Sequence, residues 1–303
     1  MSALKQSNAA KRTFETIGIV AWKDKSQDLA LALEKISQWA TVHPQVTFYV
    51  LDNLKELVKK PIKVIKASAF SKVDLLLAIG GDGTVLSAAH MALGHDTPIL
   101  GVNAGRVGFL AETRVEGLSQ TLDSLFEGDY STRERMMIDA EIYRGKKKIC
   151  SQTVLNEVHI RAHAPERMVN VSVEYNKTAL TDYWADSLLV STPTGSTAYN
   201  LAAGGPIIHP ATPAVVITPV APGSLSVRPL VVSLSSKKLQ MKSAVEKTLD
   251  LVFDGRTTVE LKPTDVVTLS ESKAVTTFIR MRHTGFVGAL REKLGWTGKP
   301  RQV

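Results

Sequence analysis

The residues of this sequence best suited to chemistry are an aspartate and the glycines around it. Asp82 lies in the run Gly80-Gly81-Asp82-Gly83-Thr84, directly behind the apolar segment 73–79. Glycines let a phosphorylated substrate come close to the main chain because no Cβ stands in the way. A carboxylate at that place can act as an acid or a base. The pattern predicts a catalytic Asp82 beside phosphate-binding residues Gly80, Gly81, Gly83 and Thr84.

The standard nucleotide motifs do not fit this run. A mononucleotide-binding loop needs a lysine after its last glycine, and none follows Gly83. A dinucleotide-binding fingerprint needs a third glycine where Leu86 stands. An ordinary strand-to-helix turn, with Asp82 or Thr84 capping the next helix, stays open as the alternative.

A second candidate site is the segment 186–206, which is rich in glycine and small hydroxyl residues and holds one aromatic residue, Tyr199. Such a segment offers amides, hydroxyls and a ring on which a base can stack, although a plain loop is the alternative. Three histidines lack the spacing of metal ligands, so hydrogen-bonded or exposed imidazoles are expected. They are His159, His163 and His209.

The elements that must position these residues change in character along the chain. Up to about residue 130, apolar strands at 17–20, 46–50, 73–79 and 98–102 alternate with helical material. Leu29, Leu33, Ile36 and Ala40 have helical spacing. Such alternation predicts a parallel sheet, at whose carboxyl edge ligands bind.

From about residue 136 the apolar residues alternate with polar ones, as at 138–143, 169–175 and 249–253. Further strands are expected at 266–269 and 275–279, and a short helix ending at Gly295. The predicted fold is an amino-terminal Rossmann-like α/β domain (residues 1–134), a carboxyl-terminal antiparallel β-sandwich domain (135–284) and a tail (285–303).

Composition limits the classes of protein. The 303 residues are 44% hydrophobic and 22% charged, as in a folded domain, and no apolar run approaches the roughly 18 to 20 residues of a membrane span. The first dozen residues lack the apolar core of a secretory signal and are expected to form a frayed tail. Cys150 is the single cysteine. Cytoplasm is therefore the expected location. The net charge of +8 is spread along the chain, so nucleic acid is an unlikely partner and anionic small substrates are favoured.

Four blocks in order resemble those of the NAD kinases, which phosphorylate the 2′-hydroxyl of the adenosine ribose of NAD to give NADP. The resemblance extends from Ile17 to about Trp296, and its third block is close to diagnostic. The blocks are 80–84, Asn156-Glu157, 192–206 and Asp254-Gly255.

The resemblance implies an active site in a cleft between two domains, a tail that packs back on the first domain, and a homodimer or homotetramer. It implies that Asp82 meets the reacting hydroxyl, that Asn156 and Glu157 bind adenosine, and that Phe109 lines that site. The other substrate-binding residues implied are Gly83, Asp186, Thr194, Thr197, Ala198, Tyr199 and Asp254.

Phosphoryl transfer from ATP would use Asp82 as proton acceptor, and Mg²⁺ or Mn²⁺ would bridge the donor phosphates without a dedicated set of protein ligands. Inorganic polyphosphate is the alternative donor. Three positions depart from the family pattern, namely Trp184, Ser187 and Gly223. Rival interpretations are a lipid kinase that shares the Gly-Gly-Asp-Gly run, a sensor that binds NAD or NADP without turnover, and RNA binding by the basic tails.

Overall fold

The computed structural model describes residues 6–7, 13–23, 27–66, 70, 72–105, 108–163, 168–281 and 285–296. The chain divides into two compact units. The first, here called the α/β unit, comprises Lys5–Glu134 and Thr276–Val303. The second, the β unit, comprises Arg135–Val275 with Met1–Leu4.

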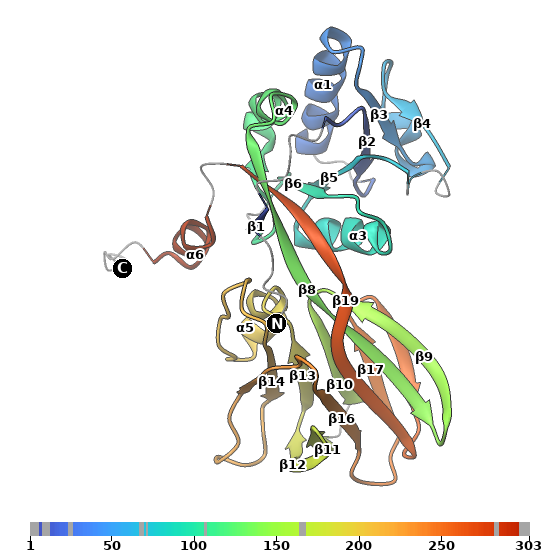
Figure 1. The fold of residues 1–303 in the computed structure, drawn as a ribbon, viewed down its shortest axis with the longest axis vertical. Helices are drawn as coiled ribbons and strands as arrows, with labels where there is room; N and C mark the ends of the chain where they lie inside the picture. The colour runs from blue at the N-terminus through green and yellow to red at the C-terminus, as the bar shows by residue number, and fades with distance from the viewer. Residues whose placement is uncertain are drawn as a thin grey trace. The chain divides into compact units, whose positions relative to one another are not determined.

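The α/β unit contains a parallel sheet in the order β6-β5-β2-β3-β4 (Figure 1). The residues of β5 from Leu75 to Ile79 are all buried, as expected for a parallel strand covered on both faces. The predicted parallel α/β domain is confirmed. Its strands are β2 (Thr16–Val20), β3 (Thr47–Val50), β4 (Lys63–Val64), β5 (Leu75–Gly80), β6 (Ile99–Asn103) and β7 (Thr113–Arg114).

Helix α1 of the α/β unit buries one apolar face, whereas in α3 every residue from Thr84 to Ala89 is buried. In α1 the buried side chains include Leu29, Leu33, Ile36 and Ala40, which confirms the predicted helical spacing. α1 and α4 lie side by side (Figure 1). The helices are α1 (Gln27–Val42), η1 (Asp52–Leu57), α3 (Asp82–Ala92), η2 (Val115–Gly117), α4 (Leu118–Phe126) and α6 (Phe286–Leu294).

The tail helix α6 belongs to the α/β unit, as predicted. Arg114 forms an ion pair with Glu292 of α6 at 2.6 Å. Gly295 ends the helix in the left-handed conformation, with φ at +66°, where glycine carries no steric penalty. This glycine stop was predicted.

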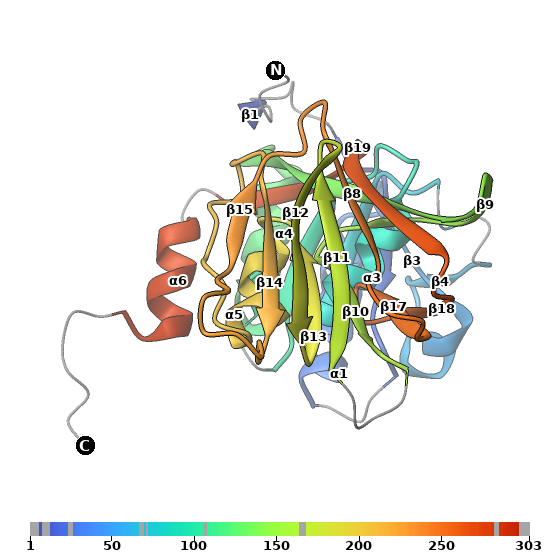
Figure 2. The same cartoon turned by 90° about the horizontal axis from the view of Figure 1, so that it is seen from below.

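The β unit contains two antiparallel sheets whose inner faces share one apolar core. One sheet has the order β15-β14-β13-β10-β17-β18, and the other contains β12-β11-β16-β19 with the β8–β9 hairpin. Figure 2 shows β15, β14 and β13 side by side. The sandwich prediction is confirmed, since alternate residues of each strand enter the core.

The strands of the β unit vary widely in length, and β8 and β19 extend into the α/β unit with residues 130–134 and 276–281. The strands are β8 (Tyr130–Arg144), β9 (Lys147–Val154), β10 (Glu157–Ala162), β11 (Val169–Tyr175), β12 (Thr178–Ala185), β13 (Ser187–Ser191), β14 (Val215–Val220), β15 (Leu230–Val232), β16 (Lys238–Ser243), β17 (Leu249–Phe253), β18 (Thr257–Leu261) and β19 (Asp265–Met281).

Two expectations about the ends and breaks of strands are wrong. Strands predicted separately at 266–269 and 275–279 form one 17-residue strand, β19. Residues Gln6–Ser7 are not frayed but form β1, which pairs with β8; the rest of the first dozen up to Arg12 lies outside the described residues. Within the described ranges, no helix is both long and apolar enough to cross a membrane.

Candidate functional site

The Asp82 turn joins the end of β5 to the start of α3. Gly80 has a φ of +152°, and an added methyl group there would lie 2.3 Å from Thr84 Oγ1, so a side chain has no room. At Gly81 and Gly83 an added methyl group would meet nothing within 4 Å. The open space at these two glycines, at the positive end of α3, suits an anionic ligand.

The Asp82 carboxylate is held by the main chain of a loop that follows β6. Its Oδ2 accepts a hydrogen bond from the Phe109 N–H at 2.7 Å, and its Oδ1 accepts one from the Leu110 N–H at 3.0 Å. An added methyl group on Gly108 would lie 1.9 Å from Oδ1, so the close approach requires glycine. Each oxygen keeps a further acceptor position for a substrate hydroxyl.

The capping interpretation of the Asp82 turn is wrong. The N-cap of α3 is Gly81, and no side chain makes a capping hydrogen bond there. Asp82 is the first helical residue, and its carboxylate is directed to the loop at 108–110 instead. The carboxylate thereby brings Phe109 next to the glycine turn.

In the β unit, Asp254 organises the segment that leads into β10. It follows β17 in the left-handed conformation, with φ at +49°. Its carboxylate accepts hydrogen bonds from the N–H groups of Leu155 at 2.9 Å, Asn156 at 2.7 Å and Glu157 at 3.0 Å. Asp254 is buried, so its contacts are those of a residue that fixes the backbone of the Asn156-Glu157 pair.

Asn156, Glu157 and His159 present buried polar atoms without a hydrogen-bond partner among the described residues, namely Oδ1, Oε2 and Nε2, respectively. Burial, with a smaller contribution from Asp254, raises the pKa of Glu157 to about 7. Burial, helped by Arg161, lowers the pKa of His159 to about 4. A buried polar atom without a partner is costly, so this group is suited to a polar ligand.

His159 lies on the same face of β10 as Glu157, since residues two apart on a strand share a face. Its ring meets the Tyr199 ring edge-on, with centroids 5.3 Å apart. The expectation of a hydrogen-bonded or exposed imidazole is wrong for His159, whose Nε2 is buried and has no partner among the residues that the structure describes. His163 fits it, because its Nδ1 lies 2.8 Å from Asp250 Oδ1.

The glycine- and hydroxyl-rich segment folds around its own hydrogen bonds. Thr192 Oγ1 donates to the Leu155 carbonyl at 2.5 Å and accepts from the Gly195 N–H at 3.1 Å. An added methyl group on Gly195 would lie 2.1 Å from the Asn156 carbonyl oxygen, so this approach also requires glycine. The segment thus packs against the Asn156-Glu157 pair, and it contains η3 (Gly195–Thr197) and α5 (Tyr199–Ala202) rather than a plain loop.

Asn200 completes this internal network. Its Nδ2 donates to the carbonyls of Ser196 at 3.0 Å and Pro206 at 3.1 Å, and its Oδ1 accepts from Thr218 Oγ1 at 2.6 Å. Of the predicted binding residues in the segment, Thr194 is buried, Thr197 and Ala198 are half-buried, and Tyr199 is exposed.

Asp186 lies near the three residues that depart from the family pattern. Trp184 and Ser187 are close to it in the chain, and Gly223 contacts Trp184. Asp186 is exposed between β12 and β13, and Ser187 is buried in β13. The Gly223 N–H donates to the Trp184 carbonyl at 2.9 Å, and an added methyl group on Gly223 would lie 2.9 Å from Trp184 Cε3. A larger side chain at residue 223 would require Trp184 to move, so Gly223 and Trp184 depend on each other.

The structure therefore brings the predicted residues together in two groups. Asp82, its glycines and Phe109 meet in the α/β unit, and Asn156, Glu157, Asp254 and the 192–206 segment meet in the β unit. Among the described residues, no group of three or more His, Cys, Asp or Glu side chains could hold a metal ion.

Sequence reasoning missed three residues at these groups. They are Gly108, His159 and Lys293, whose Nζ lies 4.3 Å from the centre of the Phe109 ring. Strand alternation from Glu157 could have found His159. No local signal marks Gly108 or Lys293, because their roles depend on tertiary contacts.

Comparisons with known proteins agree with one another. The profile described as the ATP-NAD kinase N-terminal domain matches residues 2–130, and that of the ATP-NAD kinase C-terminal domain matches residues 155–281. A NAD kinase of Desulfatibacillum aliphaticivorans is 36% identical over 281 residues, covering 88% of this chain and 99% of the relative. A NAD kinase of Geobacter sulfurreducens is 39% identical over 223 residues, covering 74% of this chain and 78% of the relative.

Two solved structures share the fold. The crystal structure of yeast NADH kinase complexed with NADH has a TM-score of 0.87 and 21% identity, and covers 100% of this chain and 94% of that one. A NAD kinase from Archaeoglobus fulgidus in complex with ATP has a TM-score of 0.72 and 22% identity, and covers 92% of this chain and 97% of that one.

Proposed function

The chain belongs to the ATP-NAD kinase family, and from this premise we propose how its residues carry out the reaction. The protein is an enzyme that phosphorylates NAD with ATP to give NADP. The observation that carries our assignment of residues is the Asp82 carboxylate, fixed by two backbone amides between two glycines with open space around them.

Asp82 is the proposed proton acceptor. A ribose hydroxyl is a poor nucleophile at neutral pH, so transfer requires positioning and removal of its proton. A carboxylate whose oxygens each accept one amide hydrogen bond is held in a fixed orientation and retains acceptor capacity for the hydroxyl. We assign phosphate binding to Gly80, Gly81, Gly83 and Thr84 at the start of α3.

The residues of the β unit are the proposed binding site for NAD. Asn156 Oδ1 and Glu157 Oε2 lack a partner in the described part of the chain, which supports their assignment to adenosine, because its hydroxyls and amino group supply donors for both atoms. Asp254 would act through the backbone that it holds. The remaining assignments rest on the family pattern: Phe109 lines the adenosine site, Thr194, Thr197 and Tyr199 hold adenine and ribose, and Asp186 and Ala198 contact the nicotinamide end.

The divalent cation, Mg²⁺ or Mn²⁺, would enter with ATP as part of the substrate. When bound it neutralises charge on the donor phosphates. Gly81 and Gly83 leave open space beside the Asp82 carboxylate, which supports binding of the donor phosphates together with their cation there. Polyphosphate as a second donor stays a prediction.

We also propose a homodimer or homotetramer located in the cytoplasm. The apolar side chains Leu225, Leu230 and Val231 are exposed, and β15 is the edge strand of its sheet. An exposed apolar sheet edge favours association with a second copy. A single cysteine agrees with a reducing compartment.

The test measures NADP formation from NAD, ATP and Mg²⁺ with an NADP-specific dehydrogenase, for wild type, Asp82→Asn and the control Asp52→Asn. Asp52 is an exposed aspartate of the same unit. We expect Asp82→Asn to lower kcat on the order of 10² to 10⁴ while NAD still binds. Asp52→Asn should match wild type.

Two outcomes would contradict the assignment of Asp82. An Asp82→Asn enzyme within about threefold of wild type would exclude proton acceptance by this carboxylate. Equal increases in both KM values together with a lower Tm would mean that Asp82 only holds the loop at 108–110. A parallel assay with inorganic polyphosphate tests the second donor.

A further inference from the structure

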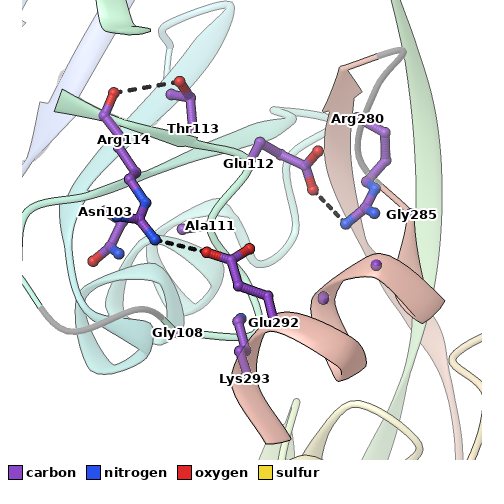
Figure 3. Close-up of a pocket in the computed structure, with 12 residues that line it drawn as sticks. Asn103, Gly108, Ala111, Glu112, Thr113, Arg114, Arg280, Gly285, Glu292 and Lys293 are labelled. Atoms are coloured by element: carbon purple, nitrogen blue, oxygen red, sulfur yellow. Dashed lines mark hydrogen bonds and ion pairs between the residues drawn. The ribbon is translucent and has the colours of Figure 1, made fainter. Parts of the chain in front are cut away.

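A cavity of about 310 Å³ lies within the α/β unit, between α6 and residues that follow β6 (Figure 3). Its volume is at the lower end of the range for small-molecule sites. Gly108 of the Asp82 loop lines it on one side, and Gly288 and Lys293 of α6 line it on the other. The cavity therefore adjoins the loop that Asp82 holds.

Four of the five charged side chains that line the cavity are paired with each other. Glu112 forms an ion pair with Arg280, and Arg114 forms one with Glu292, as Figure 3 shows. Each pair is electrically neutral. The fifth, Lys293, gives the cavity a net positive charge.

Lys293 forms no ion pair with any residue that the structure describes. Its Nζ is buried and has no hydrogen-bond partner among the described residues, and it lies 4.3 Å from the centre of the Phe109 ring. Burial lowers the pKa of Lys293, and the charges of Asp82 and Glu292 oppose that effect. An aromatic face compensates only part of the lost hydration of an ammonium group, which leaves three N–H donors to satisfy.

A second polar atom in the same cavity is also unpartnered. Asn103 Oδ1 is buried without a hydrogen-bond partner in the described part of the chain. A buried ammonium and a buried amide in one cavity call for a small, polar, negatively charged ligand. Phe109 contacts both charged groups, because its N–H donates to Asp82 Oδ2 and its ring lies against the Lys293 ammonium.

We propose that this cavity is an anion site in which Lys293 binds a phosphate group. The phosphate belongs either to the polyphosphate chain of the donor or to a free inorganic anion. The first source rests on the kinase activity proposed above; the second does not.

The test titrates the full-length protein with inorganic tripolyphosphate, without divalent cation, by calorimetry. Lys293→Met removes the charge and keeps the apolar stem, whereas Lys293→Arg keeps a charge. Gly288→Leu adds a bulky side chain to the cavity lining without changing any charge, and the position has room for it because an added methyl group there meets nothing within 4 Å. Arg291→Met is the matched control, because Arg291 is an exposed cation of the same helix.

We expect wild type to bind tripolyphosphate with a Kd below about 1 mM, and Lys293→Met and Gly288→Leu to weaken binding about tenfold or more. Lys293→Arg should recover part of the loss, and Arg291→Met should match wild type. If Lys293→Met fails to fold, Gly288→Leu decides. No binding by wild type, or equal binding by the folded Lys293→Met and Gly288→Leu proteins, would overturn the proposal.

Steady-state kinetics identify the source of the phosphate. A site for the donor predicts that Lys293→Met raises KM for ATP about tenfold or more and leaves KM for NAD within about twofold. A site for a free anion predicts an unchanged KM for ATP with weakened tripolyphosphate binding. If wild type forms no NADP, the kinase proposal fails, and the calorimetric result still decides whether the cavity binds anions.

Discussion

Replacing Glu157 by glutamine should stabilise the protein, and by an amount that depends on pH. Burial, together with the neighbouring Asp254, raises the pKa of Glu157 from 4.5 to about 7. Between these values the folded state holds a proton that the unfolded state has lost. The free energy of unfolding therefore falls as pH rises through this window, and the full cost is present above about pH 7.

The magnitude follows from the width of the window. From 4.5 to about 7, at about 1.36 kcal/mol per pH unit, the ionisation of Glu157 costs about 3 kcal/mol. Glutamine cannot ionise, so Glu157→Gln removes this cost. The stability of the variant relative to wild type should thus be about 3 kcal/mol greater at pH 8.5 than at pH 4.5.

The stability of wild type must be subtracted from that of the variant at each pH, because His159 also makes stability depend on pH. Its pKa is lowered from 6.5 to about 4, so the unfolded state binds the extra proton and stability rises with pH between these values. This slope opposes that of Glu157, and the two nearly cancel in wild type between about pH 4.5 and 6.5. In Glu157→Gln the rising slope of His159 should appear by itself.

The assay is urea unfolding followed by circular dichroism at steps from about pH 4.5 to 8.5. Glu246→Gln is the matched control, because Glu246 is an exposed glutamate of the same unit. A difference between Glu157→Gln and wild type that stays constant within about 0.5 kcal/mol over this range would refute the reasoning. So would an equal pH dependence in the control.

Three further results are expected. Gly108→Ala places a methyl group 1.9 Å from Asp82 Oδ1, so the loop must shift, and kcat/KM in the NADP assay should fall at least about tenfold. Thr218→Val leaves the buried Asn200 Oδ1 without the donor that it has at 2.6 Å, and should cost about 1–3 kcal/mol in urea unfolding. A chelator should abolish NADP formation, and added Mg²⁺ or Mn²⁺ should restore it; activity that persists after chelation would exclude a role for the cation.

The sequence predicted those parts of the fold that rest on local patterns. The apolar run before Gly80 predicted β5, because a parallel strand buried on both faces needs continuous apolar residues. Alternation predicted the sandwich, because one face of each strand enters the core. The glycines around Asp82 marked the turn, and at Gly80 both the conformation and the close contact with Thr84 exclude a larger residue.

The features that the sequence did not predict depend on contacts between residues far apart in the chain. Asp254 stays a predicted substrate-binding residue, and the sequence did not predict that its carboxylate accepts hydrogen bonds from three backbone amides about a hundred residues away in the chain. β19 was expected as two strands, because the polar stretch at 270–274 interrupts its apolar pattern. Lys293 gives no local signal, because only the packing of α6 brings its ammonium to Phe109.

Both groups of candidate residues contain buried polar atoms that have no partner among the described residues. Asn156, Glu157 and His159 in the β unit, and Asn103 and Lys293 in the α/β unit, each bury a polar atom that no described residue satisfies. Each such atom destabilises the ligand-free protein, and an apolar side chain of similar shape would fold more stably. Gly80 and Gly108 are likewise required by close contacts near Asp82 rather than by core packing. The stability lost at these positions is what a bound ligand can recover, which is the physical reason to place binding there.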